Sequence, residues 1–123
     1  MWGLVAAMMV VLMYGSVRPM AGESLVAKSD KVAHALAYGA LTVAVVAALR
    51  RGSSWGAGRV ALVAFGWAAA YGALAEVIQA FVGRVADVWD GMANAAGAGL
   101  AVLVFLCLAA RRARHARYGA SQK

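Results

Sequence analysis

Charged residues are scarce in this sequence. Only 14% of its 123 residues are Asp, Glu, Lys or Arg, whereas 64% are hydrophobic. Soluble domains carry about 25% charged residues, and a soluble fold this small buries too little of its surface to hide so many apolar side chains. A soluble globular domain is therefore excluded, and the apolar side chains are expected to face lipid.

Cysteine and proline each occur once. Cys107 has no partner in the chain for a disulfide and is interpreted as a small packing residue. Pro19 follows Arg18 and ends the first apolar run, because a charge stops the run and a proline stops the helical hydrogen-bond ladder.

Four apolar runs remain, and they predict an all-α, four-transmembrane-helix bundle that forms a single membrane domain over residues 1–123. The predicted helices are 2–17, 32–49, 60–82 and 88–110, followed by a basic tail at 111–123. The first run is the shortest, and a cleaved signal peptide is the alternative interpretation. Because no basic residue precedes it and no clear small-x-small cleavage site follows, we predict that it is retained.

Acidic residues are absent from one side of this predicted topology. With four helices, both termini and the central loop share a side, which carries eight basic residues: Arg50, Arg51, Arg59, Arg111, Arg112, Arg114, Arg117 and Lys123. The opposite side carries four: Arg18, Lys28, Lys31 and Arg84. All five acids fall in or near the two loops of that opposite side: Glu23, Asp30, Glu76, Asp87 and Asp90. The positive-inside rule therefore predicts cytoplasmic termini in a bacterial plasma membrane.

The net charge of +7 does not indicate a nucleic-acid-binding protein. The positive charge is divided among short segments that flank the apolar runs, and no folded module presents it. The tail "RRARHARYGASQK" is interpreted as a topology signal that also attracts anionic lipid headgroups. Membrane lipids, rather than nucleic acid, are the expected partners.

Polar residues form one stripe on each of the last three predicted helices. At 100° per residue, each stripe falls within an arc of about 80 to 100°. The stripes are Lys31, His34, Tyr38 and Thr42; Gly72, Ala75, Glu76 and Gln79; and Asp87, Asp90, Asn94, Gly97 and Ala101. His34, Glu76 and Asn94 lie at similar depth, and a charge against lipid costs at least about 2.5 to 3.5 kcal/mol. The stripes should therefore face one another, and the small residues beside them, Gly72 and Gly97 among them, should let the helices pack closely.

The stripes also carry a family resemblance. The segments "GSVRP" (15–19), "DKVAHALAY" (30–38) and "YGALAEVIQAFVGRVADVWDGMANAAG" (71–97) resemble the VanZ-like family of small multi-pass bacterial membrane proteins. The matching residues are Asp30, Lys31, His34, Tyr38, Glu76, Gln79, Arg84, Asp87, Asp90, Asn94 and Gly97. The family takes its name from a determinant of glycopeptide resistance, chiefly to teicoplanin, so the resemblance implies a role in the cell envelope.

The leading hypothesis is an outer-leaflet polar pocket that binds an anionic envelope lipid or cell-wall precursor headgroup. Lys31 and Arg84 would hold the anion; salt bridges to Asp30 and Asp87 are the alternative for these two residues. His34, Glu76, Asp90 and Asn94 would lie beneath. Glu76 is expected to pair with His34 or Lys31, and His34 to bond Glu76 or Asp90. Asp87 fits a helix cap, and Gln79 and Tyr38 fit structural hydrogen bonds.

Two other classes of function compete with this hypothesis. A membrane-embedded enzyme could use the same His, Glu and Asp for acid-base chemistry or for a divalent cation such as Mg²⁺. Against it, Ser16 and Ser24 have no base at a recognisable spacing, and His-x-x-x-His and Cys-x-x-Cys pairs are lacking. No cofactor is predicted. Alternatively the polar residues are only interhelical clamps.

Overall fold

A computed structural model describes residues 1–17, 26–83 and 88–121, without the side chains of residues 26–30. Within these ranges the chain forms helices, and residues 53–56 connect two of them. The helices are α1 (Trp2–Val17), α2 (Val26–Gly52), α3 (Ala57–Phe81) and α4 (Val88–Ala120). The described part of the chain is thus all-helical, as predicted.

Three of the helices are long and apolar enough to cross a membrane. These are α2 from Lys31, α3 and α4, whereas α1 is a shorter apolar helix of 16 residues. Helices suit a bilayer because every interior N–H and C=O group is satisfied within the segment, where no water can replace a missing bond. Large apolar side chains point outward on all four helices; Leu62 and Phe81, for example, are 73% and 86% exposed. This outward apolar surface is what a lipid-facing bundle requires.

The observed helix bounds differ from the predicted ones mainly at the polar ends. α1 matches the predicted 2–17, but α2 covers 26–52 rather than 32–49, and α3 covers 57–81 rather than 60–82. The largest correction is α4, which continues through the predicted basic tail to Ala120 instead of ending at residue 110. Apolar runs locate the hydrocarbon-compatible part of a helix, while Ala and Arg are strong helix formers that extend it into the polar region.

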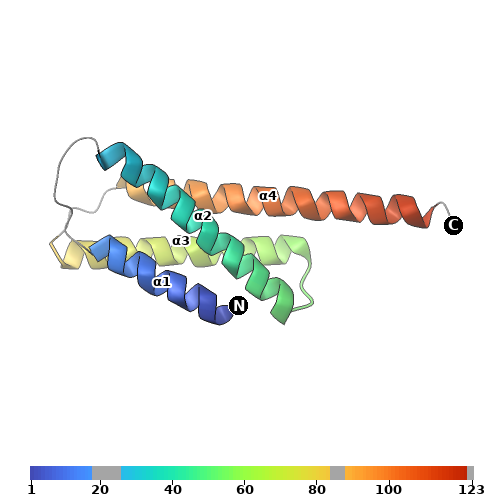
Figure 1. The fold of residues 1–123 in the computed structure, drawn as a ribbon, viewed down its shortest axis with the longest axis horizontal. Helices are drawn as coiled ribbons and strands as arrows, with labels where there is room; N and C mark the ends of the chain where they lie inside the picture. Colours follow the sequence, from blue (N-terminus) through green and yellow to red (C-terminus); the bar gives the residue numbers. More distant parts are fainter. Residues whose placement is uncertain (18–25, 84–87, 122–123) are drawn as a thin grey trace.

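Helix α2 crosses obliquely over the others and contacts each of them (Figure 1). The core lies where the helices meet and contains Tyr38, Leu41 and Val45 of α2 with Val60 and Ala64 of α3. Close packing of α2 and α4 depends on glycine. A Cβ on Gly97 would lie 1.9 Å from the carbonyl oxygen of Ala35, and one on Gly39 would lie 3.3 Å from the Gly97 carbonyl oxygen. The predicted packing role of Gly97 follows from this contact.

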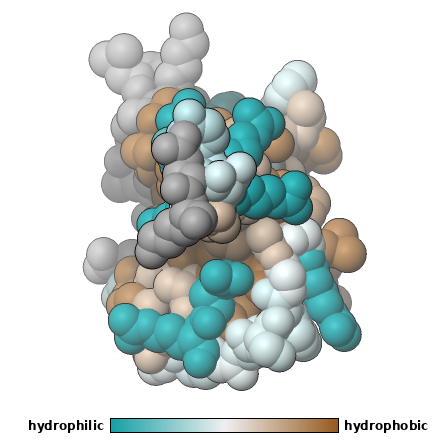
Figure 2. Space-filling model, turned by 90° about the vertical axis from the view of Figure 1, so that its right-hand side faces the viewer, coloured by the Kyte–Doolittle hydropathy of each residue, from teal (hydrophilic) through white to brown (hydrophobic). Residues whose placement is uncertain are grey.

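The two ends of the bundle differ in composition. Both chain termini lie toward the end that carries the connection between α2 and α3, and α4 projects beyond the other helices there (Figure 1). Seen from that end, hydrophilic side chains gather around an apolar interior (Figure 2). Lys31, His34, Glu76, Asp90 and Asn94 lie toward the opposite ends of their helices. This arrangement places the predicted polar stripes at a common level.

Candidate functional site

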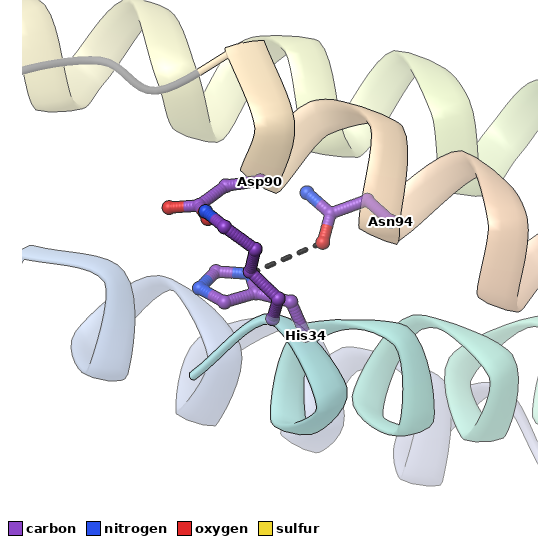
Figure 3. Close-up of polar contacts among 4 residues, drawn as sticks. His34, Asp90 and Asn94 are labelled. Carbon is purple, nitrogen blue, oxygen red and sulfur yellow. Dashed lines mark hydrogen bonds and ion pairs between the residues drawn. The ribbon is translucent and has the colours of Figure 1, made fainter. Parts of the chain in front are cut away.

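Two polar contacts join α2 to α4 and define what we call the α2–α4 clamp: Lys31, His34, Asp90 and Asn94. Lys31 Nζ lies 3.2 Å from Asp90 Oδ1, and His34 Nδ1 lies 3.1 Å from Asn94 Oδ1. Figure 3 shows His34 of α2 reaching toward Asn94 of α4, with Asp90 one turn away on the same helix. Residues three or four apart share a helix face, so the spacing of each pair along its helix explains why both contacts form.

The exposure of the clamp residues decreases from Lys31 toward Asn94. The side chains of Lys31 and Asp90 are 39% and 14% exposed, whereas Asn94 is only 5% exposed. An amide oxygen cannot donate, so the His34 ring donates from a protonated Nδ1 to Asn94. The described contacts of His34 and Lys31 are with Asn94 and Asp90, whereas the sequence analysis expected contacts with Glu76.

Glu76 faces α4 from α3 and lines a cavity of about 150 Å³ between them. Asn94, Gly72 and Gly91 line the same cavity. A Cβ at Gly91 would lie 2.1 Å from Glu76 Oε1, so the carboxylate lies in the space beside Gly91 that a side chain there would fill. Among the described residues no ion pair or hydrogen bond to Glu76 is present. The cavity therefore holds a carboxylate and an amide whose capacity for hydrogen bonds is not used up by the described part of the chain.

Tyr38 lies at the centre of this region and is 1% exposed. Its hydroxyl is buried and has no hydrogen-bond partner among the described residues. A Cβ on Gly72 would lie 3.3 Å from Tyr38 Cε1 and 3.4 Å from Asn94 Nδ2, so the ring and the amide pack directly against the backbone of α3 at this glycine. Thr42 does not satisfy the tyrosine hydroxyl, because its own hydroxyl donates to the Tyr38 carbonyl oxygen at 2.7 Å. A buried hydroxyl without a partner costs about 1 to 3 kcal/mol, which a bound ligand or water would recover.

A second cavity, of about 280 Å³, lies between α1 and α2, and His34 and Tyr38 line it from α2. Leu12, Gly15 and Ser16 of α1 line it. Because α1 forms one wall, retention of the first helix is necessary for this cavity to exist.

Helix α1 is fastened by two side chains of α3. Gln79 Nε2 donates to the Ser16 carbonyl oxygen at 3.1 Å, and the Tyr71 hydroxyl donates to the Met9 carbonyl oxygen. Gln79 therefore has a structural contact, as the sequence prediction proposed. No pattern in the sequence indicates the roles of Ser16 and Met9, because every residue offers a backbone acceptor. None indicates Gly91 either, because its contact depends on how far the Glu76 side chain reaches.

Three predicted site residues cannot be placed in this geometry. Asp30 belongs to α2, but its side chain is outside the described set, and Arg84 and Asp87 lie outside the described residues altogether. Their predicted roles stay predictions. In the described part of the chain, no three His, Cys, Asp or Glu side chains gather closely enough to hold a metal ion.

The sequence matches the model of one protein family. The family model described as VanZ/LLP1 matches residues 5–109, which include α2, α3, most of α1 and α4, and every predicted site residue. Searches of curated proteins and of solved structures found no match. With a family match over most of its length and a helical bundle suited to a membrane, this chain belongs to the VanZ/LLP1 family.

Proposed function

We propose that this protein is a bacterial plasma-membrane protein whose polar pocket binds the headgroup of an anionic envelope lipid or lipid-linked cell-wall precursor. The observation that carries the proposal is the cavity shared by Glu76 and Asn94, which lies next to the Lys31–Asp90 pair. A carboxylate without a described partner is costly in a membrane helix and is more often functional than structural.

A headgroup of this class matches the chemistry of the pocket. Its phosphate would bind the Lys31 ammonium group. The Lys31 side chain is 39% exposed at the rim, so it can replace its ion pair with Asp90 by an ion pair with the phosphate. Arg84 is the second predicted cation. Hydroxyl or amide groups of the headgroup would donate to Glu76 and accept from the Asn94 amide. The Tyr38 hydroxyl, which is buried without a described partner, offers a further hydrogen bond at the same level.

A purely structural role is the second candidate, because both clamp contacts join α2 to α4. Hydrogen bonds in membrane proteins contribute about 0.6 kcal/mol on average. The clamp contributes to stability on this interpretation, but Glu76 does not, since no described contact depends on its charge. Substitution of Glu76 therefore separates the two candidates.

The test compares lipids retained by the purified protein in native nanodiscs, identified by mass spectrometry. Glu76→Gln keeps the shape of the side chain and removes the charge, and Lys31→Gln removes the rim cation. Each is expected to lower retention of the specific lipid about tenfold, equivalent to about 1.4 kcal/mol, while Glu76→Gln leaves the thermal midpoint unchanged. Val77→Ala, an outward-facing neighbour that is 52% exposed, is the matched control.

Unchanged retention in both variants would rule out the pocket as a headgroup site. Loss of folding together with loss of lipid in Lys31→Gln, with Glu76→Gln unaffected in both, would favour the structural role instead, because Lys31 belongs to the clamp and Glu76 does not. We also propose a link to glycopeptide tolerance, which the name of the family suggests. It is measured separately, as the growth of cells that express the wild-type chain or Glu76→Gln in the presence of teicoplanin. If the headgroup site acts in resistance, cells that express the wild-type chain should tolerate more teicoplanin than cells that express Glu76→Gln.

A further inference from the structure

The end of the bundle opposite the polar pocket is rich in arginine and poor in acid. The described arginines there, all exposed, are Arg50 and Arg51 of α2, Arg59 of α3, and Arg111, Arg112, Arg114 and Arg117 of α4. No acidic residue occurs between residues 31 and 75 or after residue 90. Acidic side chains of the neighbouring segments therefore do not neutralise these arginines.

Two of these arginines line one cavity, of about 380 Å³, which we call the arginine cavity. Its walls come from three helices: Arg50 of α2, Ala57 of α3, and Phe105, Leu108, Ala109 and Arg112 of α4. The volume falls within the range of about 300 to 1,000 Å³ that is typical of small-molecule sites. A cavity with two guanidinium groups and an apolar wall is suited to a ligand that is anionic at one end and apolar at the other.

The order of residues along α4 separates the polar and apolar parts of the cavity. Phe105, Leu108 and Arg112 share one helix face, and Phe105 lies about 10 Å from Arg112 along the helix axis, toward the centre of the bundle. An acyl chain would pack against Phe105 and Leu108 while its phosphate reached the arginines. Gly56 provides no side-chain cap for α3, so the positive end of the α3 dipole at Ala57 adds to the same field.

The other arginines are less suited to hold the same ligand. Arg59 stacks on Trp55, with its guanidinium carbon 4.4 Å from the centre of the ring. Arg51, Arg114 and Arg117 do not line the cavity. Arg50 and Arg112 approach it from different helices, and a planar guanidinium binds phosphate oxygens through two parallel hydrogen bonds.

From this geometry we infer that the arginine cavity is a binding site for the phosphate headgroup of an anionic phospholipid, separate from the polar pocket. The ligand connects the C-terminal end of α2 to α4 at the point where α4 leaves the bundle. The site is independent of the proposed function, since none of its residues belongs to the polar pocket.

The test uses the full chain in nanodiscs of phosphatidylglycerol mixed with phosphatidylcholine, and counts retained phosphatidylglycerol by native mass spectrometry. The double variant Arg50→Gln and Arg112→Gln is expected to lower retention at least about fivefold. The charge-matched control, Arg51→Gln with Arg117→Gln, removes the same charge outside the cavity and should keep retention within about twofold of wild type. Thermal midpoints of both variants should equal that of wild type, because these arginines make no described ion pair.

An equal loss in the two double variants would overturn the site and indicate diffuse attraction by the basic end. No loss in the cavity variant would overturn it as well. Displacement of the lipid by excess inorganic phosphate would overturn the assignment to a lipid headgroup and indicate a soluble phosphate ligand at the same arginines. If the double variant does not fold, Arg112→Gln alone should still lower retention at least about threefold.

Discussion

His34 and Asn94 show how one hydrogen bond can define the depth of a polar site. The bond joins a ring on α2 to a buried amide on α4 at 3.1 Å, and the carboxamide also lies against Gly72 of α3. The Oδ1 atom of Asn94 therefore contacts α2, and its Nδ2 atom lies against α3. Of the four clamp residues, Asn94 is the one that lines the cavity that Glu76 faces.

Replacement of Asn94 by leucine should destabilise the bundle by about 1 to 2 kcal/mol, because His34 loses its acceptor while the volume is nearly kept. A double-mutant cycle with His34→Leu, measured by reversible unfolding in mixed micelles, should give a coupling energy of about 0.6 to 1.7 kcal/mol. Met92→Leu, on the exposed face of α4, should leave stability unchanged. A coupling energy of zero would mean that the contact contributes nothing to stability.

The composition of the clamp was partly predictable from sequence. Helical periodicity correctly placed Lys31 and His34 on the face of α2 that meets Asp90 and Asn94, since the angular spacing of residues on a helix follows from the sequence alone. The pairing of individual atoms was not predictable. Glu76, Asp90 and Asn94 lie at similar depth, and only the crossing of α2 over α4 decides which of them the His34 ring reaches.

Helices α2 and α4 approach one another through glycine rather than through complementary large side chains. The backbone at Gly97 lies so close to Ala35 that any Cβ would meet a carbonyl group, which cannot move as a side chain can. Small residues at the crossing bring the clamp residues within hydrogen-bonding distance. The polar contacts thus depend on an apolar feature of the same two elements.

Substitution Gly97→Ala is therefore expected to destabilise the protein by about 1 to 3 kcal/mol, the usual cost of overpacking. Gly99→Ala is the matched control, because its Cβ would have only an ordinary contact of 3.8 Å with the Phe65 ring. The measurement is the thermal midpoint of each purified variant in detergent. Equal midpoints for the two variants would show that α2 and α4 do not pack closely at Gly97.

The whole molecule is polarised from end to end. The described acids, Glu76 and Asp90, lie at one end with the rest of the clamp, and the exposed arginines lie at the other. Helix α4 has 33 residues and is about 50 Å long, compared with about 30 Å for the hydrocarbon layer. Its last turns, with Arg111, Arg112, Arg114 and Arg117, must therefore extend into headgroups and water.

The orientation of this polarity in the membrane is a prediction from the sequence. The positive-inside rule places the arginine-rich end in the cytoplasm. Single cysteines introduced after Cys107→Ser would test it by labelling with a membrane-impermeant maleimide. Ser54→Cys, in the α2–α3 connection, and Ser121→Cys should react only after the cells are opened, whereas Ser24→Cys should react in intact cells.

Both outcomes of this labelling bear on the two proposed sites. The predicted pattern would place the polar pocket in the outer leaflet, where lipid-linked precursors are used, and the arginine cavity in the cytoplasmic leaflet, which is rich in anionic lipid. Labelling of Ser54→Cys in intact cells would show that the topology is the reverse of the predicted one and that this chain does not follow the positive-inside rule. The arginine cavity would then face the outer leaflet, and its lipid would have to be sought there.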